Sequence, residues 1–141
     1  MSLVDFNKIL CPVDFSKLSD YALKHAIKLC ELFDAKLFIL HIAPHVRYSR
    51  TSYYDGDHES DFKKLCDTIP STVKFHSETI KNDDVDNGII KYANANKIDL
   101  IVIGTQGHSG IERFFLGSTT EECIRKAPCP VMVVRELDHK S

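Results

Sequence analysis

The sequence predicts an α/β fold in which a doubly wound sheet of five parallel strands carries helices on both faces. Two observations predict this fold. Five short apolar runs alternate with four stretches of helical period along the 141 residues, and the runs at 36–42 and 100–103 are almost continuously apolar, as in strands covered on both faces. Right-handed crossovers between parallel strands then place helices on both faces. We expect the strand order 3-2-1-4-5 and a single domain over residues 1–141.

The first third of the chain predicts a strand, a helix and a second strand. The apolar run 8–13 stops at Asp14 and Ser16, residue types that favour turns and helix caps. Residues 18–33 place apolar side chains at the spacing of one helix face. The run 36–42 predicts the second strand because it is apolar almost throughout.

The middle of the chain is less regular. Residues 43–57 are polar without a clear period and predict a long loop, and residues 58–69 predict a short helix. Residues 72–79 alternate in polarity, with Val73 and Phe75 expected on the same face. This alternation predicts a partly exposed strand at an edge of the sheet.

The last third predicts a third helix, a fourth strand, a glycine-rich loop, a fourth helix and a fifth strand, in residues 85–96, 100–103, 104–117, 118–127 and 131–134. The third helix follows a cap supplied by residues 82–84, and its apolar stripe begins at Val85. In doubly wound sheets a ligand binds beyond the carboxyl ends of the strands, where the strand order reverses. The segments that follow the first, second and fourth strands should therefore converge.

Composition argues against several classes of function. The chain has 18 Lys and Arg against 20 Asp and Glu, so no positive field is expected to hold nucleic acid or an anionic membrane. No apolar run approaches the roughly 20 residues of a membrane-spanning helix, and the first residues lack a signal-peptide pattern, so we expect a cytoplasmic location and no membrane partner. The five scattered cysteines are interpreted as reduced core residues, with a redox role for Cys129 as the alternative.

The candidate functional segment follows the fourth strand. Its sequence GTQGHSGIERFFLGSTTEE separates Gly104, Gly107 and Gly117 by two and nine residues, and Ser118 comes next. Glycines let a backbone approach a polyphosphate and adopt positive φ, so that its N–H groups form an anion nest. Ser118 opens a helix whose first N–H groups and dipole favour a phosphate. The segment therefore predicts a phosphate-binding loop.

A purely structural explanation competes with this one. Ser118 and Glu121 have the spacing of a capping box, in which the serine hydroxyl accepts a backbone hydrogen bond and the glutamate reaches back. Glycine-rich loops between a strand and a helix are also common. On the residues alone, both interpretations stay open.

Three segments resemble the universal stress protein family. ILCPVDFSKLSDYALKHAIKLC is similar to the first strand and helix of that family, ILHIAP to its second strand, and YANANKIDLIVIGTQGHSGIERFFLGSTTEECIRKAPCPVMVV to its third helix through its last strand. The glycine spacing resembles the family's ATP-binding signature, whereas residues 44–69 have no clear counterpart. The resemblance implies a Rossmann-like sheet, ATP as ligand, and Mg²⁺ held mostly by phosphate oxygens and water.

The resemblance also implies which residues contact the nucleotide. Asp14 matches an aspartate that contacts the nucleoside, with a turn or cap role as the alternative. Val13 and Ile42 match positions at the adenine, and ordinary core packing is their alternative. The complete expected set is Pro12, Val13, Asp14, Ser16, Ile42, Ile103, Gly104, Gly107, His108, Gly117, Ser118 and Thr119. No catalytic or metal-ligating residue is expected.

The remaining basic residues and histidines carry weaker signals. Arg47, Arg50 and Arg113 could reach a phosphate, but such residues are more often solvated surface charges. His108 lacks an acidic or nucleophilic neighbour and is given no chemistry, and His41 is expected to be a satisfied core histidine.

Three functions stay open at this stage. The chain has no GxxxxGK[ST] motif and no residue obviously placed to orient a water, so ATP hydrolysis is expected to be slow or absent. The leading hypothesis is an ATP-binding regulatory or stress-response module. The alternatives are a slow, partner-stimulated ATPase switch and a nucleotide-free dimeric interaction protein. Residues 131–134 predict a homodimer through an edge strand, and a further protein partner stays open.

Overall fold

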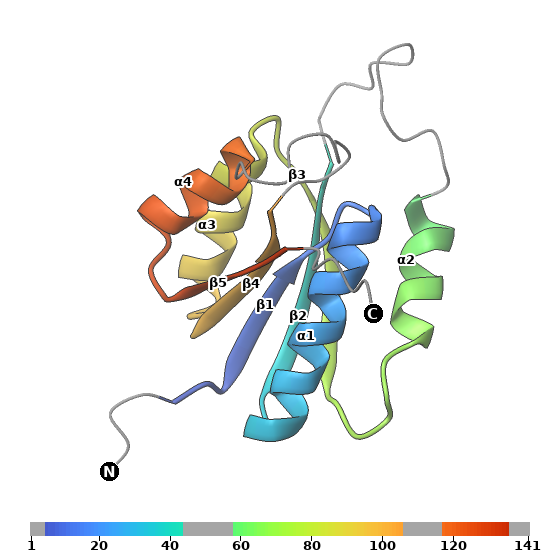
Figure 1. Cartoon of the computed structure of the whole chain (residues 1–141). Coiled ribbons are helices and arrows are strands. Elements are labelled where there is room, and N and C mark those ends of the chain that lie inside the picture. Colours follow the sequence, from blue (N-terminus) through green and yellow to red (C-terminus); the bar gives the residue numbers. More distant parts are fainter. Residues whose placement is uncertain (1–4, 44–57, 106–116, 136–141) are drawn as a thin grey trace, which may run out of the picture.

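The computed structural model describes residues 5–43, 58–105 and 117–135. Along these ranges the elements are β1 Lys8–Pro12, α1 Lys17–Phe33, β2 Lys36–Ala43, α2 His58–Asp67, β3 Phe75–Lys81, α3 Val85–Ala95, β4 Leu100–Gly104, α4 Ser118–Lys126 and β5 Val131–Val134. All strand pairs are parallel, in the order β3-β2-β1-β4-β5. Helices α1 and α2 lie on one face of the sheet and α3 and α4 on the other (Figure 1). The predicted fold and strand order are confirmed.

Strand β1 lies at the centre of the sheet and contributes side chains to both cores. It pairs with β2 on one side and with β4 on the other. Because side chains alternate along a strand, Ile9 and Cys11 belong to one buried cluster and Leu10 to the other. All three side chains are fully buried. Burial of each large aliphatic side chain contributes about 2 kcal/mol.

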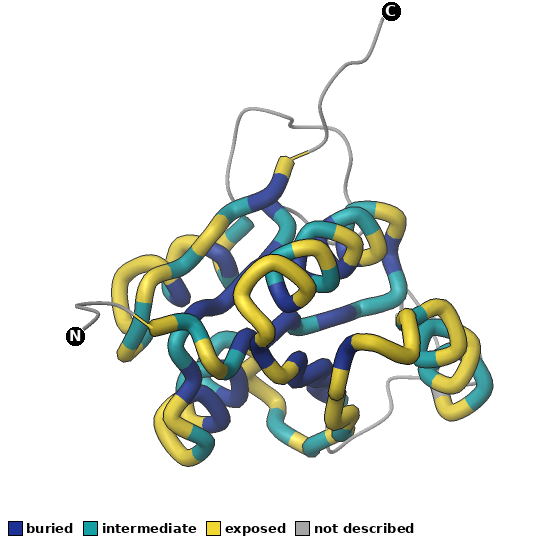
Figure 2. Tube along the Cα trace, turned by 90° about the horizontal axis from the view of Figure 1, so that it is seen from below, coloured by how far each residue is buried: buried dark blue, intermediate teal, exposed yellow. Residues whose placement is uncertain are grey.

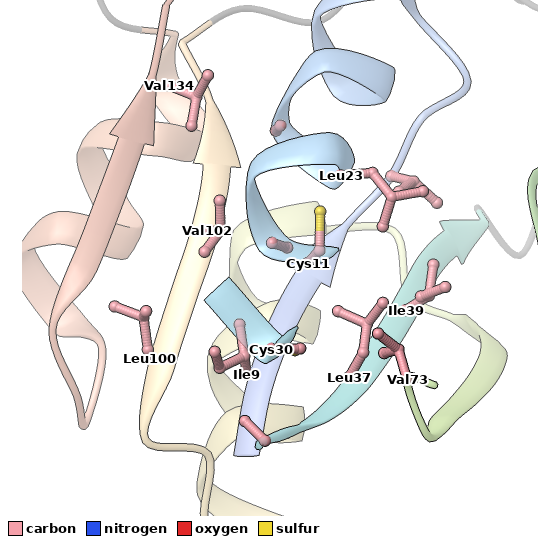
Figure 3. Packing of buried hydrophobic residues seen from close by; sticks show 14 residues of the cluster. Ile9, Cys11, Leu23, Cys30, Leu37, Ile39, Val73, Leu100, Val102 and Val134 are labelled. Carbon is pink, nitrogen blue, oxygen red and sulfur yellow. The ribbon is translucent and has the colours of Figure 1, made fainter. Parts of the chain in front are cut away.

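The two cores fill the spaces above and below the sheet. The cluster under α1 joins Leu23 and Cys30 of that helix to Leu37 and Val102 of the sheet, and Figure 3 shows these side chains pointing toward one another. The opposite cluster lies under α3 and α4. It includes Leu10, Phe38, Leu40, Ile89, Tyr92, Ile101 and Cys123. Figure 2 shows the exposed residues along the outer faces of the helices.

Helix α1 begins and ends at defined caps. The Ser16 hydroxyl accepts a hydrogen bond from the Ser19 N–H at 3.2 Å, which satisfies one of the first backbone donors of the helix. At the other end Asp34 adopts left-handed φ of 54°, and its N–H bonds the Cys30 carbonyl. Aspartate tolerates this conformation better than most residues. The predicted start of this helix differs from the observed one by a single residue.

The edge position of β3 is confirmed, but the predicted alternation is wrong at its start. Val73 is buried to 5% exposure, whereas Phe75 is 38% exposed. The strand begins only at Phe75, because residues before it form a turn in which the Val73 N–H bonds the Pro70 carbonyl at 3.0 Å. A turn breaks the two-residue period, so the two side chains do not share a face.

Helix α3 departs from its predicted stripe at the first turn. Ile89, Tyr92 and Ala93 are buried as expected, but Val85 is 43% exposed. Asp84 holds the N-cap position without a side-chain hydrogen bond to the helix. The Asn82 side chain instead accepts from the Asp84 N–H at 2.9 Å. Residues 82–84 therefore form a local turn ahead of the helix.

Candidate functional site

The segments expected to bind nucleotide follow the carboxyl ends of neighbouring strands. All strands are parallel, so these ends lie at one rim of the sheet. Asp14 follows β1, Ile42 lies near the end of β2, and Gly104 ends β4 (Figure 1). The predicted convergence of these segments is confirmed at the level of the rim, which we call the carboxyl rim. Over the described ranges, no helix combines the length and apolar character that crossing a bilayer requires.

The turn between β1 and α1 is held by short polar side chains. The Asp14 carboxylate accepts a hydrogen bond from the Ser16 N–H at 3.0 Å, and the Asp14 N–H donates to the Ser19 hydroxyl at 3.1 Å. Side-chain bonds of this kind, from an aspartate to the backbone two residues on, fix tight turns. Asp14 is half-buried and thus within reach of the rim. Asp14 therefore has the turn role that the sequence left open as an alternative. This role is compatible with ligand contact.

Val13 links this turn to β2. Its N–H donates to the Leu40 carbonyl at 2.8 Å, and its carbonyl is 3.0 Å from Nδ1 of His41. Because a carbonyl only accepts, His41 carries its proton on Nδ1 when it makes this bond. Burial lowers the pKa of His41, and the bond to Val13 opposes part of that change. His41 is buried in the core as expected and its Nδ1 bond joins two strand ends, but its buried Nε2 has no hydrogen bond within the described residues, so the expected full satisfaction is not confirmed.

Phe15 has the least usual backbone in the turn. Its φ is 65°, a left-handed conformation that costs an L-residue with a bulky side chain about 1–2 kcal/mol. The ring lies 4.7 Å from the His41 ring and 5.9 Å from the Phe62 ring, centroid to centroid. Aromatic pairs contribute about 0.5–1.5 kcal/mol each beyond burial, so these contacts are of the size needed to hold the strained backbone.

Gly104 is required by packing. A Cβ added at Gly104 would lie 3.0 Å from Cγ of Leu18 and 3.3 Å from its carbonyl oxygen. The absence of a side chain therefore lets the first turn of α1 approach the end of β4. Gly104 and Gly117 both lack positive φ, so the expectation that these glycines supply left-handed backbone is wrong for these two positions.

The start of α4 is tied to the end of β4 by two further bonds. The Gly117 N–H donates to the Thr105 carbonyl at 2.6 Å, and the buried Thr120 hydroxyl donates to the Gly104 carbonyl at 2.8 Å. The ends of the glycine-rich segment are thus brought together at the carboxyl rim. This closure places the first turn of α4 beside Gly104, which itself contacts α1.

The capping-box interpretation of Ser118 is wrong. Gly117 is the N-cap of α4, in extended conformation with φ −69° and ψ 158°, and its carbonyl accepts from the Glu121 N–H at 3.0 Å. Ser118 is the first helical residue, and among the described residues no side chain caps this end. The first N–H groups of α4 face the rim without an intrahelical acceptor, because the first turn of any helix has none.

Three of the expected site residues are buried apolar side chains and offer no polar contact. Val13, Ile42 and Ile103 are 4%, 8% and 7% exposed. Ile42 packs toward α3, where a Cβ on Gly88 would approach its Cδ1 to 2.9 Å. Pro12 ends β1 opposite Leu40 of β2. The core-packing alternative for Val13 and Ile42 is therefore present at both positions.

Several expected residues lie outside the described ranges. These are Gly107, His108, Arg47, Arg50 and Arg113. The remaining expected residues at the glycine-rich segment are described: Ser118 is exposed and Thr119 half-buried at the start of α4.

The cysteines and acidic side chains add no second chemistry within the described ranges. Cys11, Cys30 and Cys123 are buried, and Cys66 and Cys129 half-buried, all as free thiols. Burial raises the pKa of Cys30 and Cys123 to about 12 and that of Cys129 above its usual value, which disfavours reactive thiolates. In the same ranges no three His, Cys, Asp or Glu side chains gather as a metal site.

A family model described as the universal stress protein family matches residues 5–135. The chain belongs to this family. A curated universal stress protein of Methanocaldococcus jannaschii is 33% identical over 142 residues, covering 93% of this chain and 83% of that protein. The family assignment therefore rests on sequence as well as on the strand order.

Two solved family structures share the fold at low sequence identity. A universal stress protein in complex with cAMP has a TM-score of 0.73 at 18% identity, covering 92% of this chain and 97% of that one. The universal stress protein from Archaeoglobus fulgidus in complex with dAMP has a TM-score of 0.64 at 19% identity, covering 94% and 100%. Both of these neighbours carry adenine nucleotides.

Several residues that shape the rim were missed by sequence reasoning. Thr120 and Ser19 anchor the helix starts through side-chain bonds, and Leu18 explains Gly104. Phe15 gave no signal either, because nothing in a sequence reports φ. For Thr120 the signal was present: a threonine in the first turn of a helix that follows a glycine-rich loop has a hydroxyl that can bond nearby backbone.

Proposed function

We propose that residues 1–141 act as one universal stress protein domain that binds ATP, with its Mg²⁺, at the carboxyl rim and serves as a nucleotide-dependent regulatory module. The observation that carries the proposal is the start of α4. Its N-cap is a glycine without a side-chain cap, and its first N–H groups and dipole favour a phosphate. Ser118 is exposed there and adds a hydroxyl donor.

The other side of the rim supplies partners for a nucleoside. Asp14 offers a half-buried carboxylate beside α1, which can accept from ribose hydroxyls. Val13 and Ile42 are buried apolar side chains at the strand ends, next to which the adenine would lie. The contact of Gly104 with Leu18 brings these two sides next to each other. The two neighbours that carry cAMP and dAMP support an adenine nucleotide as the ligand class.

Slow or absent hydrolysis is part of the proposal, because the sequence has no GxxxxGK[ST] motif. Among the described residues no cluster of acidic or histidine side chains can hold a metal, so Mg²⁺ would be held by phosphate oxygens and water. We propose a nucleotide binder rather than an ATPase. The near-balance of 18 Lys and Arg against 20 Asp and Glu supports a proposal without nucleic acid as a partner, and we propose a cytosolic location. A slow, partner-stimulated ATPase remains the second hypothesis, and phosphate release with and without cell extract separates the two.

Titration calorimetry with Mg²⁺-ATP on wild type and on Gly117→Val tests the proposal. Gly117 has an extended backbone that a valine can adopt, so the substitution adds bulk at the N-cap without backbone strain. We expect wild type to bind and Gly117→Val to bind at least about tenfold more weakly, equivalent to ~1.4 kcal/mol. Thr72→Val, an exposed position before β3 at the opposite rim, is the control and should bind as wild type. Absence of binding to wild type at millimolar nucleotide contradicts the proposal.

We also propose a homodimer through β5. This strand ends the sheet order, and Met132 on it is 39% exposed, so its edge and side chain are available to a second copy. Light scattering after size exclusion should give twice the chain mass for wild type. Met132→Lys should shift the population toward monomer because it buries a charge at the edge. A monomeric wild type at tens of micromolar, roughly, contradicts the dimer.

A further inference from the structure

We propose that helix α2 acts on the candidate nucleotide site from outside it: the Phe62 ring holds the Phe15 ring, and Phe15 in turn fixes the backbone turn that orients Asp14. Phe62 is thus a positioning residue, and α2 a point at which a partner could change nucleotide affinity. The inference rests on the proposed nucleotide binding, and its first measurement is independent of nucleotide.

The starting observation is the strained backbone of Phe15. Its φ of 65° is left-handed, a conformation that a bulky L-residue adopts only when its surroundings hold it. Such strain is commonly found at functional sites, and this residue lies directly between Asp14 and Ser16 of the rim. Contacts of the Phe15 side chain must offset the free-energy cost of this backbone conformation.

Two described rings make those contacts from different elements. His41 of β2 lies 4.7 Å away with an interplanar angle of 48°. Phe62 of α2 lies 5.9 Å away at 74°, an edge-to-face arrangement. His41 is buried in the sheet and bonded to Val13, so it is a fixed support. Phe62 is the contact that can change, because it depends on the position of α2.

The packing of α2 makes that position adjustable. Phe62, Leu65 and Cys66 form its inward stripe at the spacing i, i+3 and i+4, Ile69 follows in the turn after the helix, and all four are only half-buried. Figure 1 shows α2 beside α1, with the amino-terminal end of α2 near the β1–α1 turn. Helices with little fully buried surface are the ones that shift or detach at low cost.

The backbone conformation of Phe15 determines how the Asp14 carboxylate is oriented. The Ser16 N–H reaches the Asp14 carboxylate at 3.0 Å across Phe15, a three-residue turn whose closure depends on the central φ. If Phe15 relaxes to negative φ, the Ser16 N–H rotates away and the carboxylate loses this hydrogen bond. Ligand affinity and α2 docking are therefore coupled, and coupling of this kind is reciprocal.

The first experiment follows the Ser16 amide by NMR hydrogen exchange in nucleotide-free protein. We expect Phe62→Ala to raise the exchange rate of this amide about tenfold relative to wild type, since the turn that protects it opens. Lys64→Ala is the control, because it shortens an exposed side chain of the same helix and leaves the inward-facing residues unchanged, and it should change the rate less than about twofold. Phe62→Leu keeps the bulk of the side chain without its ring edge and serves if the alanine variant fails to fold; an intermediate increase is expected.

The second experiment measures Mg²⁺-ATP affinity by calorimetry for the same variants. Phe62→Ala and Phe62→Leu should weaken binding, the alanine variant by about fivefold or more, and Lys64→Ala should not. Unchanged Ser16 exchange in folded Phe62 variants, or equal changes in Lys64→Ala, overturns the positioning role. If wild type binds no nucleotide but Ser16 exchange responds as expected, the proposed function fails and the coupling of α2 to the turn stands.

Discussion

The two helices that begin at the carboxyl rim start in different ways. Helix α1 is capped by the Ser16 hydroxyl, and its approach is fixed by bonds from Asp14 and Ser19. Helix α4 has a glycine at the N-cap and no side-chain cap among the described residues, so it is held from the side, through Thr120 and the Gly117 N–H. At α1 a side chain therefore satisfies one of the first backbone donors, whereas no described side chain does so at α4.

The carboxyl rim therefore has two halves, one near β1 that is organised by side chains and one near β4 that is organised by backbone packing. In the half near β1, polar side chains and a strained Phe15 set the position of Asp14. In the half near β4, the close approach of Gly104 to Leu18 sets the position of the loop ends. Substitutions in the two halves should therefore differ in how far they lower the free energy of unfolding and in how far they weaken ligand binding.

The largest effect on stability is expected from Gly104→Val. The added atoms meet Leu18 at its Cγ and its backbone oxygen, and backbone cannot yield as a flexible side chain can. We expect the free energy of unfolding to fall by about 3 kcal/mol, measured by urea denaturation. Gly88→Ala is the control, because the three atoms nearest its added Cβ all belong to side chains, two to Ile42 and one to Asn82. A Gly104→Val protein as stable as wild type would remove packing as the reason for this glycine.

Thr120→Val should give the next largest effect. The substitution keeps the shape of the side chain but removes the hydroxyl that donates to the Gly104 carbonyl at 2.8 Å. Because Thr120 is 2% exposed, no water replaces the bond, and we expect a loss of about 2 kcal/mol in the free energy of unfolding. Thr120→Ser, which retains the donor, should lose less. Equal losses in both variants would show that the methyl group matters more than the bond.

The two helix starts are compared directly by Ser16→Ala and Ser118→Ala. Ser16→Ala removes the cap of α1 and should lower the free energy of unfolding by about 1 kcal/mol. Ser118→Ala should leave stability within about 0.5 kcal/mol of wild type, because Ser118 is exposed and caps nothing, while it weakens ATP binding under the proposed function. Thermal unfolding followed by circular dichroism checks both. A destabilised Ser118→Ala protein would restore the capping-box interpretation.

The smallest change is expected from pH, through His41. Burial lowers the pKa of His41 in the folded protein, so below about pH 6.5 the unfolded chain binds a proton that the folded chain does not. The free energy of unfolding should therefore fall as pH drops through 6.5, until the folded-state pKa is reached. Urea denaturation of wild type and His41→Asn between pH 7.5 and 5, roughly, isolates this contribution. Parallel pH dependences of the two proteins would show that His41 does not carry it.

Much of the fold could be predicted because periodicity reports burial directly. The apolar runs that became β2 and β4 and the stripe of α1 needed no tertiary information, since each side chain belongs to a face fixed by local geometry. The errors came where a local pattern had two meanings. Val73 fits an alternating strand but lies in a turn, and Ser118 fits a capping box but lies one residue inside the helix.

The sequence by itself predicted a parallel sheet and the segments that meet at the carboxyl rim from its hydrophobic period, and its motifs indicated the family and with it the strand order. Only the tertiary structure decided why particular residues stand there. Gly104 is small because α1 packs against it, and Phe15 tolerates its left-handed backbone in contact with rings from β2 and α2. Such reasons depend on atoms that are distant in the chain and adjacent in space, and no local pattern encodes them.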